Sequence, residues 1–598
     1  MSRVVAVALT LFSLAPGAPA AEPESTDVIV VGSGISGLSA ALEAARGGAS
    51  VRVVEMWSVF GGHAVMAHGG LCLVDTPIQH RQGVLDSPAL AERDFLEWGE
   101  DADPAQVSRY VHRSRELVYD WLLELGVRFS DRLIQIPGNS VPRFHSPLGR
   151  GLGLVTPILR ACLRHPGVRF EWNTRALELV SADGRVTGVR AVSTRSAEKQ
   201  VFEAEQVILA TGGFQSNLEM VQEFWPERHP FPERLLVGSG VNSVGSGHRI
   251  AEAAGATLVD MGRQWNYATG LPDPRRPGTD RGVNASNGAS IWVNLEGRRF
   301  VNETASTKER LAATLRQPRA RYWAVFDAPG RRRLFVSGSD WADRDTVERL
   351  VLENPALAKK AQDLARLGEA MELPKGVLEE TVARYNAALE EGVDENFQRF
   401  GHGGVPYDLA PGSGQGAVPI VTPPFYALPF FPLARKSMGG VAVDLEGRVL
   451  DTAGHPIPGL RAVGELTGFG GVNGWAGLEG TFLGPSVVTG RTAATSLLAE
   501  LSGPPRRATP EDPPRRDEEI GPAPADADCM MCHDLPSLVE RARPGYAHFE
   551  AVHRVVSQTA RPCLECHASL WPFDPDAHVV DRLAQAETCG SCHLAREH

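Results

Sequence analysis

Three copies of one cysteine motif near the C-terminus carry the plainest chemistry in this sequence. The segments CMMCH (529–533), CLECH (563–567) and CGSCH (589–593) share the spacing C-x-x-C-H and use six of the eight cysteines. In this pattern two thiols add to the vinyl groups of a haem, and the adjoining histidine is an axial iron ligand. Paired C-x-x-C is also zinc spacing, but zinc does not require a histidine after every second cysteine. The motif predicts three haem c groups, attached through Cys529, Cys532, Cys563, Cys566, Cys589 and Cys592.

The iron ligands are predicted from the histidines of the same segment. Each motif histidine, His533, His567 or His593, supplies one ligand. No methionine follows Met531, so we expect a second histidine on each iron. The candidates for this second ligand are His548, His553, His578 and His598, one of which is spare.

A glycine-rich turn near the N-terminus predicts a dinucleotide site. Residues 27–55 read as strand, glycine turn, helix and strand, with Gly32, Gly34 and Gly37 spaced as G-x-G-x-x-G. The first glycine permits the turn, the second lets the backbone approach a pyrophosphate, and the third lets the helix pack closely. Glu55 closes the second strand, where a carboxylate can bind the ribose hydroxyls. The turn alone does not distinguish NAD from FAD.

Later segments match one flavoprotein family. They are GG at 61–62 and 69–70, ILATGGF (208–214), VGSGHRIAEAAGA (244–256), RRFVNE (298–303), SMGGVAVD (437–444) and GLRAVGELTG (459–468). With them the chain resembles the family of fumarate reductase and succinate dehydrogenase, which also contains urocanate reductase and ketosteroid dehydrogenases. The resemblance covers about residues 25 to 500 and implies FAD as cofactor.

The family's fold is α/β, with a Rossmann-like FAD-binding domain interrupted by an α+β capping domain. The resemblance implies FAD-binding segments at 25–261 and 433–501, and a cap at 262–432 that holds substrate against them. We also expect an amphipathic helix from Gly376 to Gly392, with its apolar side chains in the cap core. The helix starting near Ser486 is expected to direct its N-terminus at the flavin pyrimidine edge. The further cofactor-binding positions implied are Gly61, Gly62, His63, Gly69, Gly70, Ala210, Thr211, Gly212 and Glu465.

His63 raises a separate question about attachment of the flavin. Residues His63, Val65, Ala67 and Gly69–Gly70 fit the run in which succinate dehydrogenases join a histidine covalently to the flavin. The preceding Gly61–Gly62 belongs instead to the type that binds FAD without a covalent bond. Both alternatives remain open, and the sequence favours the non-covalent one. We interpret His68 as a packing residue.

Four substrate-binding positions of fumarate reductases carry different residues here. Thr307 stands where the family has its proton-donating Arg, Lys436 replaces a His, and Gly477 and Asn266 fall at the positions of another Arg and His. Arg310 lies about one helical turn after Thr307, so it and Lys436 are the candidate catalytic residues, whereas Lys308 is interpreted as a surface charge. Replacement by functional residues, namely Lys436, Trp475 and Glu479, favours a changed substrate over lost activity.

The remaining segments indicate where the protein works. Residues 1–20 read as a signal peptide, with an apolar run after Arg3 and an A-x-A site, so we expect a periplasmic protein that does not span the membrane. A Pro-rich linker (502–528) separates the flavin part from the mostly irregular or helical cytochrome segment (529–598). The net charge of −12 argues against nucleic acid as a partner. We expect a monomer.

FAD exchanges two electrons with a substrate, whereas each haem passes one electron at a time. The combination predicts an oxidoreductase that couples chemistry at a CH–CH bond of a small organic molecule to a periplasmic electron-transfer protein or a quinol-oxidising cytochrome. The architecture resembles the soluble flavocytochrome c fumarate reductases, although their haem domain is N-terminal and usually holds four haems. The alternatives are an electron carrier or store without substrate turnover, and a true fumarate reductase.

Overall fold

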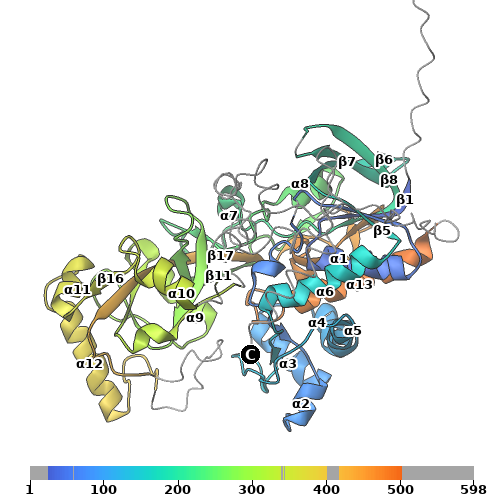
Figure 1. Cartoon of the computed structure of the whole chain (residues 1–598). Helices are drawn as coiled ribbons and strands as arrows, with labels where there is room; N and C mark the ends of the chain where they lie inside the picture. Colours follow the sequence, from blue (N-terminus) through green and yellow to red (C-terminus); the bar gives the residue numbers. More distant parts are fainter. Residues whose placement is uncertain are drawn as a thin grey trace, which may run out of the picture.

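The structure is a computed structural model that describes residues 25–57, 59–194, 196–338, 341, 344–400 and 417–501. The predicted signal peptide, Pro-rich linker and trihaem segment lie outside these residues. Across the described ranges, no helix has the length and apolar character needed to cross a membrane. Figure 1 shows this part of the chain as two lobes, with β11 and β17 running between them.

The larger lobe is built on a sheet centred on β1 (Thr26–Val31). β1 pairs in parallel with β2 (Val51–Val54) on one side and with β8 (Lys199–Leu209) on the other. β5 (Val168–Glu171) extends the sheet beyond β2, and β20 (Pro456–Ala462) extends it beyond β8, both in parallel. The two predicted FAD-binding segments, far apart in sequence, therefore share one sheet.

Three helices cover one face of this sheet: α1 (Ile35–Arg46), α6 (Arg150–Arg164) and α13 (Leu483–Leu497) (Figure 1). Val28 and Val30 of β1 belong to the core under these helices, whereas the alternate residues of β1 belong to the core on the opposite face. This alternation follows from the two-residue period of a strand, and it explains why β1 is apolar from Val28 to Val31. Strand, turn, helix and strand occur where the sequence predicts them.

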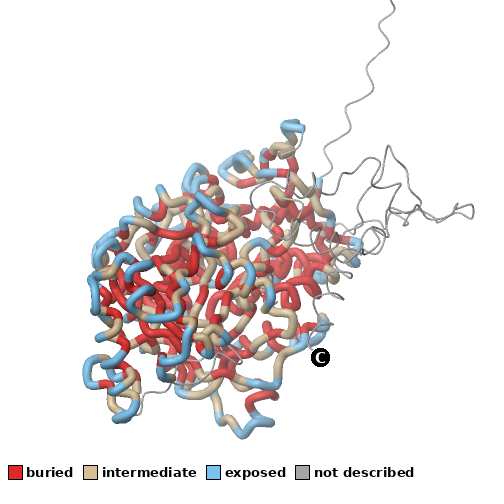
Figure 2. Tube along the Cα trace, turned by 60° about the vertical axis from the view of Figure 1, so that its left-hand side comes forward, coloured by how far each residue is buried: buried red, intermediate tan, exposed pale blue. Residues whose placement is uncertain are grey.

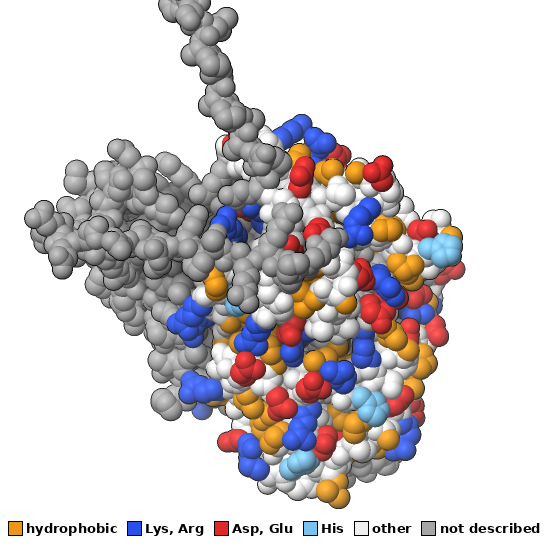
Figure 3. All heavy atoms as spheres, turned by 90° about the vertical axis from the view of Figure 1, so that its right-hand side faces the viewer, with side chains coloured by type: hydrophobic (Ala, Val, Ile, Leu, Met, Phe, Trp, Pro, Cys, Tyr) orange, Lys and Arg blue, Asp and Glu red, His pale blue; other side chains and the backbone are white. Residues whose placement is uncertain are grey.

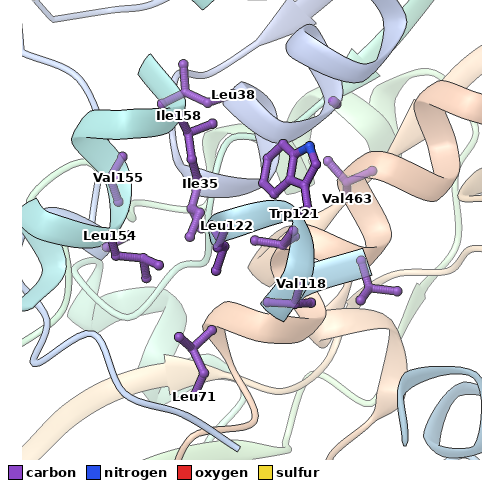
Figure 4. Packing of buried hydrophobic residues seen from close by; sticks show 14 of the residues in the cluster. Ile35, Leu38, Leu71, Val118, Trp121, Leu122, Leu154, Val155, Ile158 and Val463 are labelled. Carbon is purple, nitrogen blue, oxygen red and sulfur yellow. The ribbon is translucent and has the colours of Figure 1, made fainter. Parts of the chain in front are cut away.

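The core beneath α1 is formed by segments from across the larger lobe. Figure 4 shows Ile35 and Leu38 of α1 packed with Ile158 of α6, Trp121 and Val463. Figure 2 shows that the buried stretches of the chain run through the interior of both lobes, with exposed residues at the outer turns. This packing fixes the positions of the loops that follow β1, β2 and β8.

The other elements of the larger lobe surround this framework. They are η1 (Ala64–Met66), β3 (Leu71–Cys72), α2 (Pro77–Arg81), α3 (Pro88–Gly99), α4 (Pro104–Ser114), η2 (Arg115–Asp120), α5 (Trp121–Glu124), β4 (Phe144–His145), β6 (Thr174–Ala182), β7 (Arg185–Ser193), α7 (Leu218–Glu223), β9 (Leu236–Val237), α8 (Ser246–Ala253), β10 (Leu258–Val259), β18 (Gly440–Val441), β19 (Arg448–Leu450), η7 (Gly464–Leu466), η8 (Gly468–Gly471) and η9 (Leu498–Glu500). The β6–β7 hairpin pairs antiparallel with β8.

The smaller lobe has an antiparallel sheet in the order β13-β14-β17-β11-β12-β15, with β16 on β17. Its strands are β11 (Gln264–Pro272), β12 (Gly282–Asn287), β13 (Ile291–Val293), β14 (Tyr322–Phe326), β15 (Leu334–Val336), β16 (Lys359–Ala361) and β17 (Phe425–Ser437). Its helices are α9 (Thr307–Leu315), η3 (Pro318–Ala320), η4 (Gly330–Arg333), α10 (Arg344–Val347), η6 (Glu348–Leu352), α11 (Leu364–Ala370) and α12 (Val377–Glu391). This is the expected α+β cap. The predicted boundary at residue 432 falls inside β17, which also pairs with β9 of the larger lobe.

The predicted cap helix is α12, and its sequence explains both ends. Gly376 and Gly392 flank the helix with φ of 83° and 78°, a left-handed conformation that glycine adopts without steric cost. Leu378, Val382 and Tyr385 are its buried residues and belong to the cap core. The expectation of an amphipathic helix with structural apolar residues is confirmed.

The RRFVNE motif is a structural element of the cap. Glu303 is buried and forms ion pairs with Arg299 (2.8 Å) and Arg399 (3.2 Å). Burial would raise the pKa of Glu303, but Arg399 and Arg299 outweigh it and lower the pKa. A buried carboxylate paired with two guanidinium groups fixes the loop that leads into α9.

Candidate active site

A large cavity lies where the two lobes meet. The larger lobe contributes the glycine turn, Glu55, the segment 61–70, Ala210, Thr211, Gly212, Glu465 and Ser486. The segment before α13 contributes Glu479 and Phe482, and the strands that link the lobes contribute Tyr267 and Lys436. The predicted cofactor-binding residues and Lys436 are thus brought to one cavity, apart from Gly37, which lies behind the turn.

The glycine turn has a different steric role for each glycine. Gly32 has a φ of 110°, and a Cβ there would lie 2.5 Å from the carbonyl oxygen of Ala210. A Cβ on Gly37 would lie 2.0 Å from the carbonyl oxygen of Gly32, so α1 can approach the turn only at a glycine. A Cβ on Gly34 would meet no protein atom closer than 4.0 Å and would project into open space at the helix N-terminus. This arrangement fits a pyrophosphate bound at the start of α1.

Glu55 lies at the end of β2 beside this turn. Its Oε2 accepts hydrogen bonds from the backbone N–H (2.8 Å) and hydroxyl (2.7 Å) of Ser33, and its Oε1 accepts one from the Trp57 N–H (2.9 Å). Burial raises the pKa of Glu55, against the effect of these hydrogen bonds. Its carboxylate therefore holds the turn and lines the cavity, where it can also face a ribose.

Several polar atoms in the cavity wall have no protein partner. Thr211 Oγ1 and His63 Nε2 are buried without a hydrogen bond, although Glu465 Oε2 lies 3.8 Å from the other ring nitrogen of His63. Glu465 Oε1 accepts a hydrogen bond from the Ser437 N–H (3.0 Å). α13 begins at Leu483, three residues before Ser486, as predicted. Buried polar atoms need partners, so this wall fits a large polar cofactor such as FAD.

His63 is expected to contact the flavin without a covalent bond. Burial, with help from Arg435, lowers the pKa of His63 to about 4, so its ring is neutral at pH 7. Denaturation with trichloroacetic acid should leave all yellow colour in the supernatant. Flavin retained in the pellet of the unmodified protein would contradict this prediction. In that case, a flavin-free pellet from His63→Ala would identify His63 as the attachment site.

Lys436 is part of a hydrogen-bonded network with Tyr267, Glu479 and Trp265. Its Nζ donates to the hydroxyl of Tyr267 (2.7 Å), and that hydroxyl donates to Glu479 Oε2 (2.9 Å). Trp265 Nε1 donates to the other carboxylate oxygen of Glu479 (3.1 Å). The Lys436 ammonium also lies 3.6 Å from the ring centre of Phe482. Burial lowers the pKa of Lys436 to about 8, against Glu479, which raises it.

Of the four positions that differ from fumarate reductases, Lys436 lines the cavity, whereas Gly477, Asn266 and Thr307 do not. A Cβ on Gly477 would lie 2.9 Å from the rings of both Trp265 and Phe482, so no side chain fits there. Asn266 is buried and lies outside the cavity lining, whereas its neighbour Tyr267 lines it. Thr307 is the first residue of α9 and is also outside the lining. Trp265 and Phe482 therefore fill the space beside Gly477, the position at which the resemblance implies an Arg.

Two residues that the sequence placed in the substrate region lie elsewhere. Arg310 is buried in α9, with its guanidinium 5.5 Å from the ring centre of Trp292, and is not among the cavity-lining residues. Trp475 lies outside the lining as well, and the guanidinium of Arg228 lies 4.7 Å from the centre of its ring.

The interpretation of Lys308 as a surface charge fits its ion pair with Glu100 (2.7 Å). His68 packs between Phe144 and Phe335, with ring centres 6.1 and 6.0 Å away.

Comparison with known proteins identifies the family. A family model described as an FAD binding domain matches residues 27–483. The chain belongs to this family. A fumarate reductase (cytochrome) of Shewanella frigidimarina is 33% identical, over 79% of this chain and 76% of that protein. A KsdD-like steroid dehydrogenase of Mycobacterium tuberculosis is 32% identical, over 80% and 97% respectively.

Solved structures agree with this assignment. The open conformation of a flavocytochrome c3 fumarate reductase superimposes with a TM-score of 0.66 at 27% identity, covering 80% of this chain and 79% of that one. The protein is an FAD-dependent oxidoreductase that acts on CH–CH bonds, in the group of fumarate reductases and KsdD-like dehydrogenases. The haem-attachment cysteines and all predicted iron ligands lie outside the described residues. Within the described part, no group of His, Cys, Asp and Glu is arranged to hold a metal.

Tyr267 and Trp265 are two of the site residues that the sequence did not indicate directly. The only signal was their position on either side of Asn266, where the family's histidine falls. In a strand, side chains alternate between faces, so a one-residue change of register brings Tyr267 rather than Asn266 to the cavity. Tyr267 could be predicted only from its place next to Asn266.

Proposed function

We propose that this protein is a periplasmic flavocytochrome that exchanges electrons between FAD and a redox partner through three c-type haems. At the flavin it acts on an activated C=C bond, or forms that bond in reverse. One observation carries the proposal: three C-x-x-C-H motifs follow an FAD-binding oxidoreductase domain on the same chain. Three one-electron carriers on the same chain as a two-electron cofactor support electron transfer to or from another protein.

The haem content can be measured directly. We expect three covalent haems per FAD by pyridine haemochrome analysis, all low-spin with two histidine ligands. Replacing both motif cysteines of one segment, for example Cys563→Ala with Cys566→Ala, should remove one haem and leave the flavin. Fewer than three haems in the unmodified protein, or a Met–iron absorption band, would contradict this prediction.

The proposed location and partner rest on the sequence. The N-terminal segment has signal-peptide features, and haem c attachment takes place outside the bacterial cytoplasm. Acidic and basic side chains are interspersed on the face of the molecule in Figure 3. An electron-transfer protein of the periplasm, or a cytochrome that oxidises quinol, is the proposed partner of a monomeric enzyme.

The cavity residues support a substrate other than fumarate. Lys436, Tyr267 and Glu479 form the polar part of the cavity wall near β17. The resemblance to fumarate reductases implies a His and Arg residues in this substrate-binding region. When bound, FAD supplies the site that accepts or donates a hydride. The ammonium of Lys436 can donate a proton to the carbon next to the one that receives the hydride, and Tyr267 holds that ammonium in place. Phe482 and the ring of Tyr267 restrict access of water to it.

Stopped-flow spectroscopy tests the proposed function. The fully reduced protein is mixed with unsaturated acids, enones, and sulfur or nitrogen oxides, and haem and flavin absorbance are followed together. Oxidation of the haems by an enone or other activated alkene is the expected result. If no compound oxidises the flavin while a redox protein oxidises the haems, the electron-carrier alternative is favoured. Rapid oxidation by fumarate alone would favour a true fumarate reductase.

A further inference from the structure

The charges around Lys436 are balanced within the cavity. Its ammonium lies 3.7 Å from Glu479 Oε2, and the hydroxyl of Tyr267 bridges the two groups. Trp265 fixes the other oxygen of Glu479, so the carboxylate is held by two donors and cannot turn away freely. Lys436 and Glu479 are both largely buried, with side chains 13% and 14% exposed, so solvent screens their interaction only weakly.

Other charges in the same part of the lining do not change this balance. Arg435 donates to the carbonyl of Gly238, and the carboxylate of Glu465 adds a second negative charge to the cavity wall. His63 and His68 are neutral at pH 7, because burial lowers the pKa of each to about 4. Two cations are thus matched by two carboxylates. A dianionic substrate would meet no net positive charge from these four groups.

We propose that Glu479 is a specificity-determining residue that cancels the charge of Lys436 and so selects an uncharged activated alkene, such as an unsaturated ketone or amide, over a dicarboxylate. This inference rests on the proposed function and deepens it. The remaining N–H groups of Lys436 can still donate to a substrate carbonyl oxygen, because a neutral acceptor needs a hydrogen-bond donor but no net charge. A carboxylate of the substrate would instead be repelled by Glu479 at close range.

Fumarate and its uncharged diamide, fumaramide, form a matched pair of probes. Their dissociation constants are measured at pH 6 from changes in the flavin absorption band of the oxidised holoenzyme, so binding is observed without turnover. Lys436 keeps its proton at this pH. We expect fumaramide to bind the unmodified protein at least tenfold more tightly. Glu479→Gln should shift this ratio toward fumarate by about tenfold or more, because one buried negative charge is removed.

Two further variants make the result decisive. Glu100→Gln removes one carboxylate outside the cavity and should leave the ratio within about twofold, which controls for overall charge. Lys436→Gln should shift the ratio the opposite way, toward fumaramide, because the charge of Glu479 is then unbalanced. If Glu479→Gln does not retain flavin, an unchanged ratio in Lys436→Gln contradicts the inference. An unchanged ratio in Glu479→Gln, or binding of neither probe, overturns the inference. Failure of both probes to reoxidise the reduced flavin counts against the proposed function, whereas the ratio of dissociation constants still tests Glu479.

Discussion

Replacing Lys436 with alanine is expected to lower turnover by about a hundredfold or more, while FAD and haem contents stay unchanged. A positioned acid or base contributes an effect of this size. Lys436 lines the cavity, donates to Tyr267, and has a pKa lowered to about 8 by burial, which suits proton transfer near neutral pH. The measurement is the rate at which the alkene substrate reoxidises the reduced protein, monitored at the flavin and haem bands.

Lys308→Ala is the matched control for this variant. Lys308 also carries an ammonium in an ion pair, but with Glu100 and outside the cavity, so its loss should leave turnover unchanged. The unmodified enzyme gives a second readout through pH. Reduction of the alkene needs protonated Lys436, so its rate should be constant below pH 8 and fall above it, and this fall should disappear in Lys436→Ala. Normal turnover in Lys436→Ala would remove Lys436 from the mechanism and strengthen the electron-carrier alternative.

The local features of the fold could be predicted from the sequence because short-range rules determine them. The strand–turn–helix–strand opening and α12 occur where glycine spacing and apolar periodicity indicate them. The steric role of each glycine in the turn depends mainly on residues within the same βαβ unit and on Ala210. Such features need little knowledge of distant chain segments.

The substrate side could be predicted only in part, because it depends on pairing between distant segments. Trp265 pairs with Lys436 across β11 and β17, and this register brings Tyr267 to the cavity. Lys436 could be predicted because it stands at the position of a family His, whereas Tyr267 has no motif of its own. Arg310 is oriented toward Trp292 by the rotation of α9 about its axis. The spacing between Thr307 and Arg310 does not determine this rotation.

Gly37→Ala is expected to abolish FAD binding and to destabilise the larger lobe. The new Cβ would lie 2.0 Å from the carbonyl oxygen of Gly32 and 3.1 Å from the Cβ of Ala210. Both neighbours belong to the packed junction of β1, α1 and β8, so α1 must move away from the sheet. Thermal unfolding and flavin content of the purified protein measure the two effects. We expect a lower unfolding temperature and a flavin content near zero.

Gly34→Ala separates cofactor exclusion from misfolding. A methyl group at Gly34 meets no protein atom closer than 4.0 Å, so the fold should be retained while the methyl group enters the space expected for the pyrophosphate. Flavin content should therefore fall without the loss of stability that we expect for Gly37→Ala. Gly368→Ala, whose Cβ would be 3.6 Å from Leu378 in the cap, should change neither property. If the pyrophosphate binds at this turn, the added methyl group occupies the same space and must exclude it. Full flavin content in Gly34→Ala would therefore contradict binding of the pyrophosphate at this turn.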